Sequence, residues 1–334
     1  MTLLKAVVTG GCGFIGSHLV DNLLSQNTHV TVVDNCETGN LSNIEQLDHP
    51  SLRIIQEDIS QEGPWQSLLG DAEVIYHLAG LADIVPSIDN PSRYFEVNVT
   101  GTLNVLEAMR LGKCRRIVYA ASASCYGKAK NFPTKEDHEV SVEYPYALTK
   151  LVGEQLVEHW SKTYNFSFNS ARLFNVYGPR SRTTGAYGAV FGVFLKQKLV
   201  GSPFTVVGDG RQARDFTFVS DVVDALVQLG QFDNPNACNE IFNVCASSPV
   251  SINKLVDLLG GDVVFIPRRP GEPDITHGDN GKLMRLTQWS PKISIEDGVK
   301  VMLSEIKKWE DAPLWDENSI TEATRNWFKF LEKD

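Results

Sequence analysis

The sequence lacks the features of membrane, secreted and nucleic-acid-binding proteins. No apolar run reaches the roughly 18 residues that a bilayer span needs, and the first apolar strand starts too early to leave room for a signal peptide. The six cysteines show no Cys-x-x-Cys spacing, which predicts buried free thiols and no metal site. With 31 basic and 41 acidic residues the net charge is −10, so nucleic acid is not expected as a partner. We expect a cytoplasmic protein.

Repeats and low-complexity segments are also missing, and the composition excludes general disorder. Hydrophobic residues make up 42% of the chain and charged residues 22%, both ordinary values for a globular protein. A chain of 334 residues can bury a large core and suits two domains, or one domain with a substantial annex.

A glycine-rich stretch near the start follows the apolar run 6–8 and precedes an apolar helical face. The pattern predicts a strand, a turn and a helix, in which Gly10 permits the tight turn and Gly13 lets the main chain approach a ligand. Gly16 lets the helix pack against the sheet, so that free helix N–H groups point at a diphosphate. A glycine turn alone is weakly specific, and the surrounding pattern decides its meaning.

The second predicted strand, 30–33, ends at Asp34 and completes a βαβ unit. A carboxylate at that strand end can accept both ribose hydroxyls of an adenosine and would repel a 2′-phosphate. No Lys or Arg lies between Asp34 and Arg53. The pattern therefore predicts NAD rather than NADP as the cofactor.

Strands and helices alternate through the rest of the first half. Apolar runs predict strands at 53–56, 74–78 and 116–121, and a long helical pattern covers 91–111. This alternation is typical of an α/β fold with a parallel sheet that is wound on both faces.

A later helix carries two residues with catalytic chemistry. Tyr146 and Lys150 lie four residues apart, so they share one face of a helix that runs to about Tyr164. A lysine cation beside the phenol is expected to lower the tyrosine pKa, as a general base for a sugar or alcohol hydroxyl requires. The alternative is a pair of exposed helix residues without a role. The Ser-rich strand end at 120–127, about 20 residues earlier, favours the catalytic interpretation.

Together these features resemble the extended short-chain dehydrogenase/reductases, specifically the NAD-dependent sugar-nucleotide epimerases and dehydratases. The resemblance covers the chain to about residue 310. It rests on Thr9 to Gly16, Asp34, Asp58, His77-Leu-Ala-Gly80, Asn98, Ser122, Tyr126-Gly127, Tyr146, Lys150, Arg172 to Pro179, Gly208 to Asp215 and Arg269 to Glu272.

The resemblance implies a role for each matched position. Tyr146 is implied as the catalytic base, Lys150 as the residue that holds the nicotinamide ribose, and Ser122 as the hydrogen-bond partner of the reacting sugar hydroxyl. Further positions implied to bind the cofactor are Gly10, Gly13, Phe14, Ile15, Gly16, Asp34, Asn35, Asp58, Ile59, Leu78, Ala79, Gly80 and Asn98, and those implied to bind substrate are Ser124, Asn175, Arg214 and Arg269.

Each of these assignments has a structural alternative. Two arginines separated in sequence can clamp a diphosphate with charge-assisted bonds, but Arg214 can also form a surface ion pair with Asp215, and Arg269 can lie in a solvated turn. His77 precedes an apolar pair at a strand end, which favours a packed structural histidine. Asn98 either anchors a neighbouring loop or faces solvent.

The resemblance also implies how the chain divides. Residues 1–175 are expected to form an NAD-binding Rossmann domain, to which the segment 216–245 returns with a helix and a strand. Residues 176–215 and 246–334 are expected to form a smaller, mixed α/β domain for a nucleotide-diphosphate sugar. Beyond about Trp309 the resemblance fades, and the apolar spacing over 321–331 predicts a helix that docks on the surface or on a partner.

The residues after Ser122 bear on the reaction. Dehydratases of the family carry an Asp-Glu pair there, and decarboxylating relatives carry a Glu at the second position, whereas this chain has Ala123 and Ser124. The remaining chemistry is oxidation, rotation of the ketone and return of the hydride, which is epimerisation, most simply at C4. A 4,6-dehydratase, a C4-dehydrogenase, a C3/C5 epimerase with Cys125 as second base and a non-catalytic NAD sensor remain alternatives.

A homodimer is a further implication of the resemblance. In the family, helices corresponding to 91–111 and 146–164 pair across a two-fold axis as a four-helix bundle. The apolar residues Leu151, Leu156 and Trp160 exceed what one buried face of the second helix requires.

We predict that the protein purifies with NAD bound, because an enzyme that returns its hydride to the product gains nothing by releasing the cofactor. Denaturing the purified protein and quantifying the released NAD⁺ and NADH checks this. Finding neither, with no binding of added NAD, would contradict the cofactor assignment.

Overall fold

The computed structural model describes residues 5–181, 190–231, 237–268 and 272–331. Within these residues the main element is a seven-stranded parallel sheet in the order β11-β6-β5-β4-β1-β2-β3. Its strands are β1 (Lys5–Thr9), β2 (His29–Val33), β3 (Leu52–Ile55), β4 (Val74–His77), β5 (Arg116–Ser122), β6 (Ser167–Leu173) and β11 (Glu240–Val244). The order reverses at β1, which pairs with β2 on one side and β4 on the other.

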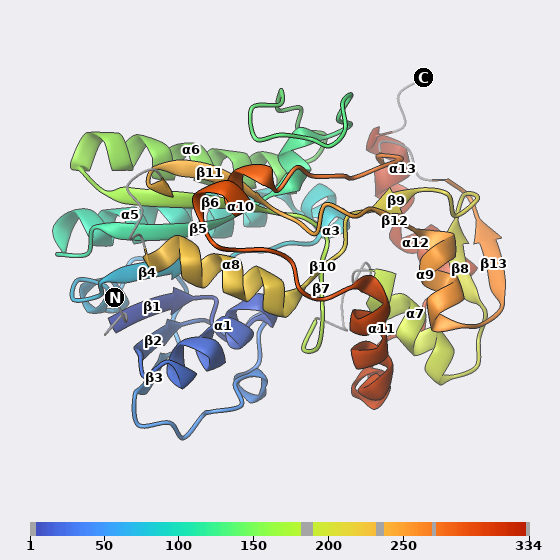
Figure 1. The fold of residues 1–334 in the computed structure, drawn as a ribbon, viewed down its shortest axis with the longest axis horizontal. Helices are drawn as coiled ribbons and strands as arrows, with labels where there is room; N and C mark the ends of the chain where they lie inside the picture. Colours follow the sequence, from blue (N-terminus) through green and yellow to red (C-terminus); the bar gives the residue numbers. More distant parts are fainter. Residues whose placement is uncertain (1–4, 182–189, 232–236, 269–271, 332–334) are drawn as a thin grey trace.

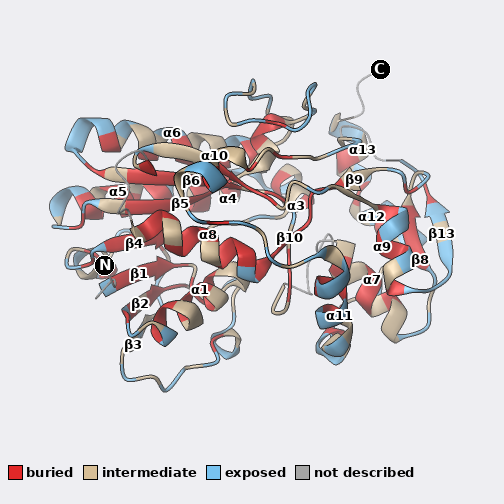
Figure 2. Cartoon of the chain, viewed as in Figure 1, coloured by how far each residue is buried: buried red, intermediate tan, exposed pale blue. Residues whose placement is uncertain are grey.

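Helices cover both faces of this sheet, as Figure 1 shows. One face carries α1 (Phe14–Ser25) and α8 (Val219–Gln231), and the other carries α5 (Gly101–Leu111) and α6 (Pro145–Tyr164). Because successive strand residues face opposite sides, Ala6 and Val8 pack in the core under α1 and α8, while Val7 packs in the core under α5 and α6. The strands are therefore buried on both faces (Figure 2). The predicted doubly wound α/β fold is confirmed.

A second group of elements lies beyond the carboxyl ends of the strands. Three small two-stranded sheets pair β7 (Val176–Tyr177) with β10 (Thr217–Phe218), β9 (Ala213–Arg214) with β12 (Val250–Ser251), and β8 (Phe204–Val207) with β13 (Val263–Ile266). The longer helices here are α7 (Val190–Leu199), α9 (Ile252–Leu259) and α11 (Ile295–Ser304). In the part of the chain that the structure describes, no helix is both long and apolar enough to cross a membrane.

Shorter elements connect these parts. They are η1 (Leu41–Asn43), α2 (Trp65–Leu68), α3 (Ile84–Asp89), α4 (Pro91–Phe95), η2 (Glu96–Thr100), η3 (Ala123–Tyr126), α10 (Gly281–Leu286), η5 (Ile306–Trp309), α12 (Glu317–Ala323) and α13 (Arg325–Leu331).

Two predicted helices are interrupted in the structure. The expected helix over 91–111 is divided into α4, the π-helical turn η2 and α5, and the expected helix over 321–331 is the pair α12 and α13. A π-turn is a local departure that often accompanies a functional site, and here it contains Asn98. The Asn98 side chain accepts from the Leu81 N–H at 2.8 Å and donates to the Leu81 carbonyl at 3.0 Å. The tertiary contact with this loop, which periodicity does not encode, accompanies the break in the helix.

A buried ion pair ties α6 to the sheet. Glu154 of α6 accepts from Arg172 of β6 at 2.6 Å and from the Ser170 hydroxyl at 2.7 Å. The side chains of Glu154 and Arg172 are only 4% and 5% exposed. Arg172 also donates to the Tyr126 hydroxyl at 2.9 Å and to the Glu136 carbonyl at 3.1 Å. These bonds fix α6 relative to β6 and to η3, the short helix that follows β5.

Removing one partner of this pair should destabilise the fold strongly. Glu154→Gln leaves the Arg172 charge buried without its carboxylate, so we predict a loss of about 3–5 kcal/mol in the free energy of unfolding. Urea denaturation measures it. The matched control is Glu158→Gln on the same helix, which breaks only the exposed pair with Lys162 and should cost less than about 1 kcal/mol. Similar small losses for both variants would contradict this account.

Candidate active site

The carboxyl ends of β1, β4 and β5 open into a cavity of about 680 Å³. It lies where the strand order reverses between β1 and β4, the position at which open α/β sheets bind their ligands. The cavity is lined by the sequence-predicted site residues Gly10, Gly13, Phe14, Ile15, Gly16, Asp34, Asn35, Asp58, Ile59, Leu78, Ala79, Gly80, Ser122, Ser124, Tyr146, Lys150, Asn175 and Arg214. Asn98 lies behind this lining, and Arg269 lies outside the described residues.

The turn between β1 and α1 forms one wall of the cavity. Gly10 has a φ of +73°, and a Cβ there would lie 2.6 Å from the backbone nitrogen of Ala79. A Cβ on Gly16 would overlap the Gly10 carbonyl oxygen. Only glycine fits these two positions without a shift, so the turn stays close to the loop after β4. The first turn of α1, with N–H groups that the helix does not use, therefore borders the cavity and suits a diphosphate.

Asp34 lies at the end of β2 beside this turn. Its two carboxylate oxygens accept the backbone N–H groups of Cys12 at 2.9 Å and Cys36 at 2.8 Å. A carboxylate has about four lone-pair positions, so these two bonds fix its orientation and leave acceptor capacity for two hydroxyl donors. The glycine turn and Asp34 together fit the diphosphate and adenosine ribose of a dinucleotide.

Arg93 of α4 reaches this end of the cavity from a distant part of the sequence. It pairs with Glu37 at 2.5 Å, Glu96 at 3.0 Å and Asp58 at 3.3 Å. Burial acts to raise the pKa of Asp58, but hydrogen bonds from Ser60, Arg93 and Asn35 together lower it. Three carboxylates thus surround one guanidinium, and this end of the cavity keeps the acidic character that favours NAD over NADP.

Two cysteines adjoin Asp34, a grouping that sequence spacing did not reveal because Cys12 and Cys36 lie on separate loops. Their sulfur atoms and an Asp34 oxygen lie within 4.8 Å of one another. Burial, together with the Asp34 charge, raises the pKa of both thiols. Both Asp34 oxygens already accept N–H bonds. The cluster therefore gives no reason to assign a metal.

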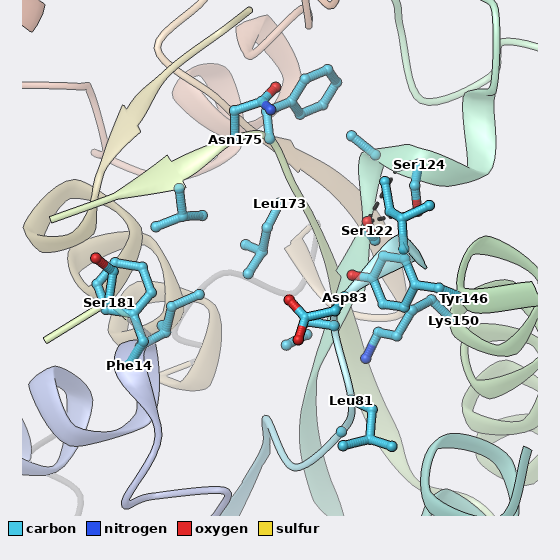
Figure 3. A pocket seen from close by; sticks show the side chains of 18 of the residues that line it. Phe14, Leu81, Asp83, Ser122, Ser124, Tyr146, Lys150, Leu173, Asn175 and Ser181 are labelled. Atoms are coloured by element: carbon cyan, nitrogen blue, oxygen red, sulfur yellow. Dashed lines mark hydrogen bonds between the residues drawn. The ribbon is translucent and has the colours of Figure 1, made fainter. Parts of the chain in front are cut away.

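The three predicted catalytic side chains lie together on the side of the cavity across from Phe14 (Figure 3). Tyr146 and Lys150 project from the first turns of α6, and Ser122 ends β5 (Figure 3). The Ser122 oxygen accepts from the Ser124 hydroxyl at 2.8 Å and from the Ser124 N–H at 3.2 Å. Since Ser124 donates in both bonds, the Ser122 proton is left to donate toward Tyr146 or a sugar hydroxyl.

The expected lowering of the Tyr146 pKa by Lys150 is wrong for this site. Burial raises the pKa of Tyr146 above its usual value, whereas Ser122 acts to lower it and Asp83 acts to raise it. Burial lowers the pKa of Lys150 to about 8, with Glu154 acting in the opposite direction. The desolvation of the buried phenol, aided by the Asp83 charge, outweighs the lowering effect of Ser122. Burial is a tertiary property that the four-residue spacing does not encode.

Asp83 is a site residue that sequence reasoning missed. It lies directly before α3, in the loop after β4. Figure 3 shows its carboxylate directed into the cavity, and its charge acts to raise the pKa of Tyr146. Its signal in the sequence was an acid three residues beyond Gly80, at the carboxyl end of a predicted strand.

Two polar residues near the site serve as supports. The ring nitrogens of His77 are hydrogen-bonded to the hydroxyls of Thr9 at 2.7 Å and Thr102 at 2.9 Å, and burial lowers the His77 pKa to about 3. A neutral histidine with both ring nitrogens hydrogen-bonded fits the interpretation of His77 as a packed structural residue. Asn98 is 2% exposed and holds the Leu81 loop, so we propose that it supports the cofactor site rather than touching the cofactor.

The opposite end of the cavity contains the predicted substrate residues. The Thr276 hydroxyl donates to the Asn175 side-chain oxygen at 2.9 Å and so orients this amide. Arg214 pairs with Glu272 at 2.7 Å, and not with its neighbour Asp215, which accepts from the Gly278 N–H at 2.9 Å instead. Glu272 thereby fixes the Arg214 guanidinium at the cavity wall, where it can meet an anion.

Cys125, the candidate second base, is only 2% exposed and packs with Tyr126, Phe174 and Cys245 in a small apolar cluster. Burial raises its pKa to about 12. A thiol in this setting is a poor base at neutral pH. This geometry gives no support to a C3/C5 epimerase that uses Cys125.

Comparisons with known proteins agree with this geometry. Residues 6–245 match the model of the NAD dependent epimerase/dehydratase family. The chain is 34% identical over 310 residues to a protein of Methanocaldococcus jannaschii described as a putative UDP-glucose 4-epimerase, covering 90% of this chain and 98% of that protein. It is 32% identical to UDP-glucuronic acid decarboxylase 4 of Arabidopsis thaliana, covering 92% and 69%.

A solved structure is similar in fold and in sequence. It is the UDP-glucuronic acid 4-epimerase of Bacillus cereus in complex with UDP-glucuronic acid and NAD, with a TM-score of 0.84 and 32% identity. The match covers 91% of this chain and 99% of that one.

Proposed function

The chain belongs to the NAD-dependent epimerase/dehydratase family, and from that premise we propose that it is a 4-epimerase of a UDP-sugar. It is an NAD-dependent isomerase, and the finer proposal is inversion at C4 through a transient 4-keto sugar. The observation that carries the proposal is the meeting of Ser122, Tyr146 and Lys150 in one cavity with a turn that fits a dinucleotide.

The chain's own residues supply binding, orientation and proton transfer. Tyr146 accepts the proton of the C4 hydroxyl, and Ser122 holds that hydroxyl by a hydrogen bond and keeps it in reach. Lys150 orients the nicotinamide ribose. Tyr146 acts from its phenolate form, which burial disfavours and a neighbouring positive charge favours. NAD, held at the glycine turn and Asp34, would supply the acceptor for the C4 hydride and the donor that returns it. Tyr146 then gives its proton back to the new hydroxyl.

The choice of epimerisation over elimination or decarboxylation is supported by Ala123 and Ser124. Neither residue has a carboxyl group that could remove water across neighbouring carbons or assist loss of carbon dioxide. The acid that does face this region, Asp83, comes from the loop after β4 and not from the position at which those relatives carry theirs. A net dehydrogenase would keep the same three residues, and accumulation of NADH would distinguish it.

The nucleotide end of the substrate is proposed to lie at Asn175 and Arg214. Relatives named for UDP-sugars motivate the uridine nucleotide, and the Arg214 guanidinium can meet its diphosphate with charge-assisted bonds. We also propose the division into a cofactor domain, 1–175 with 216–245, and a substrate domain, 176–215 with 246–334. The cavity between β1 and β4 is bordered by residues from both parts.

We further propose a homodimer through the helical layer formed by α5 and α6. Leu151, Leu156 and Trp160 are only partly buried in the protomer, so each keeps surface that a contact could cover. Phe95 and Leu148, which are 39% and 37% exposed, are apolar side chains that a two-fold contact would cover. A cytoplasmic location is proposed as well, supported by six cysteines that are all free thiols.

Replacing the base tests the function. Tyr146→Phe removes the proton acceptor and keeps the ring, so we predict a loss on the order of 10² to 10⁴ in kcat for interconversion of UDP-glucose and UDP-galactose. The sugar stereochemistry is followed by NMR, and NAD content should be unchanged.

Arg214→Ala is the contrasting variant. It removes a contact made equally to ground and transition states, so KM should rise by more than kcat falls. Near wild-type turnover in Tyr146→Phe, together with an unchanged KM in Arg214→Ala, would contradict the proposed site at both ends.

A further inference from the structure

The last described segment, residues 311–331, lies against the cavity although the family resemblance ends near residue 310. Its residues Trp315, Ile320 and Trp327 line the cavity. The match to the Bacillus cereus epimerase takes in 99% of that chain but 91% of this one. The unmatched residues therefore belong almost entirely to this chain.

The segment is anchored on two sides of the cavity. At its start, Gln197 of α7 donates to the Trp315 carbonyl at 2.7 Å. At its end, Asn326 of α13 donates to the Asp89 carboxylate of α3 at 2.8 Å. Figure 1 shows α12 and α13 between α3 and the small sheets. The segment thus bridges the loop after β4 and the substrate elements.

Trp327 brings this segment next to the catalytic base. It is 4% exposed, and its ring centre lies 6.4 Å from that of Tyr144. The Tyr144 ring in turn stacks parallel to the Tyr146 ring at 6.5 Å, with planes 6° apart. The Tyr144 hydroxyl interacts with Ser124, the residue that donates to Ser122. One line of contacts therefore runs from Trp327 through Tyr144 to both the base and the serine.

We propose that Trp327 is a positioning residue whose indole, with α12 and α13, closes the sugar end of the cavity and confines the keto sugar while it rotates. The proposal rests on the proposed function. An epimerase needs its ketone intermediate to rotate in the site without dissociating, because a ketone that dissociates leaves its hydride on the cofactor. An apolar wall also keeps water from the reacting end, which a closed site requires to prevent side reactions.

If the wall is open, the expected side reaction is release of the keto sugar into solution. The C4–H bond breaks, the hydride reduces NAD⁺ to NADH, and the hydroxyl proton passes to Tyr146. If the wall is missing, the 4-keto sugar nucleotide then leaves for solution, and reduced cofactor remains on the enzyme. Each lost ketone corresponds to one NADH that can be counted by absorbance.

Trp327→Ala tests the proposal in the full-length enzyme with UDP-glucose. We expect NADH absorbance at 340 nm to accumulate and free keto sugar, trapped by borohydride reduction, to rise by about tenfold or more per turnover over wild type. The dissociation constant of UDP alone should change less than about twofold, because the proposal gives the indole a role at the sugar and none at the nucleotide.

Matched variants keep the outcome interpretable. Trp327→Phe should restore confinement through its ring, and Phe330→Ala, on the same helix but 57% exposed, should behave as wild type. Asn326→Ala removes only the anchor to Asp89 and should also release more keto sugar than wild type. This variant tests the proposal if Trp327→Ala does not fold. A folded Trp327→Ala or Asn326→Ala that releases no more ketone than Phe330→Ala would overturn the inference. Failure of the wild type to epimerise any member of a panel of UDP-sugars, UDP-glucose and UDP-glucuronic acid among them, would instead refute the proposed function.

Discussion

The buried pair between Glu154 and Arg172 is the interaction on which the arrangement of the site depends. It joins the helix that carries the base to β6, and through the Tyr126 hydroxyl it reaches η3, which follows directly on Ser122. Tyr126 donates in turn to Asn243 of β11 at 2.7 Å. Because an unpaired charge in a low-dielectric interior is so unfavourable, these bonds hold one helix and three strand ends in a single relative position. The catalytic geometry follows from that constraint.

The cavity built on this frame has two chemically different ends. Asp34 and the acids around Arg93 border the end at the glycine turn, where hydroxyl donors fit and an additional phosphate does not. Arg214, fixed by Glu272, borders the other end and suits an anion. The buried base lines the same cavity. This polarity orients a dinucleotide and a sugar nucleotide so that their reacting atoms meet at Tyr146.

Sequence reasoning succeeded where the information is local and failed where it is tertiary. Glycine spacing, the acid after β2 and the four-residue spacing of Tyr146 and Lys150 depend on neighbours in the chain, so the parallel sheet and most of the cavity lining could be predicted. Asp83 escaped notice because an acid at a strand end is common, and its direction depends on the loop that Asn98 holds. The raised pKa of Tyr146 depends on burial by several elements. The role of α12 and α13 likewise arises only from packing across the whole chain.

The account stands on one claim, that the hydride removed from C4 returns to the same sugar within one closed site. Incubation of the wild-type protein with UDP-glucose deuterated at C4 tests it directly, with the product analysed by NMR and mass spectrometry. We predict UDP-galactose that retains the deuterium at C4, with no label in the solvent and no accumulation of NADH. Product that has lost the label, or deuterated NADH in amounts equal to the sugar consumed, would contradict the account.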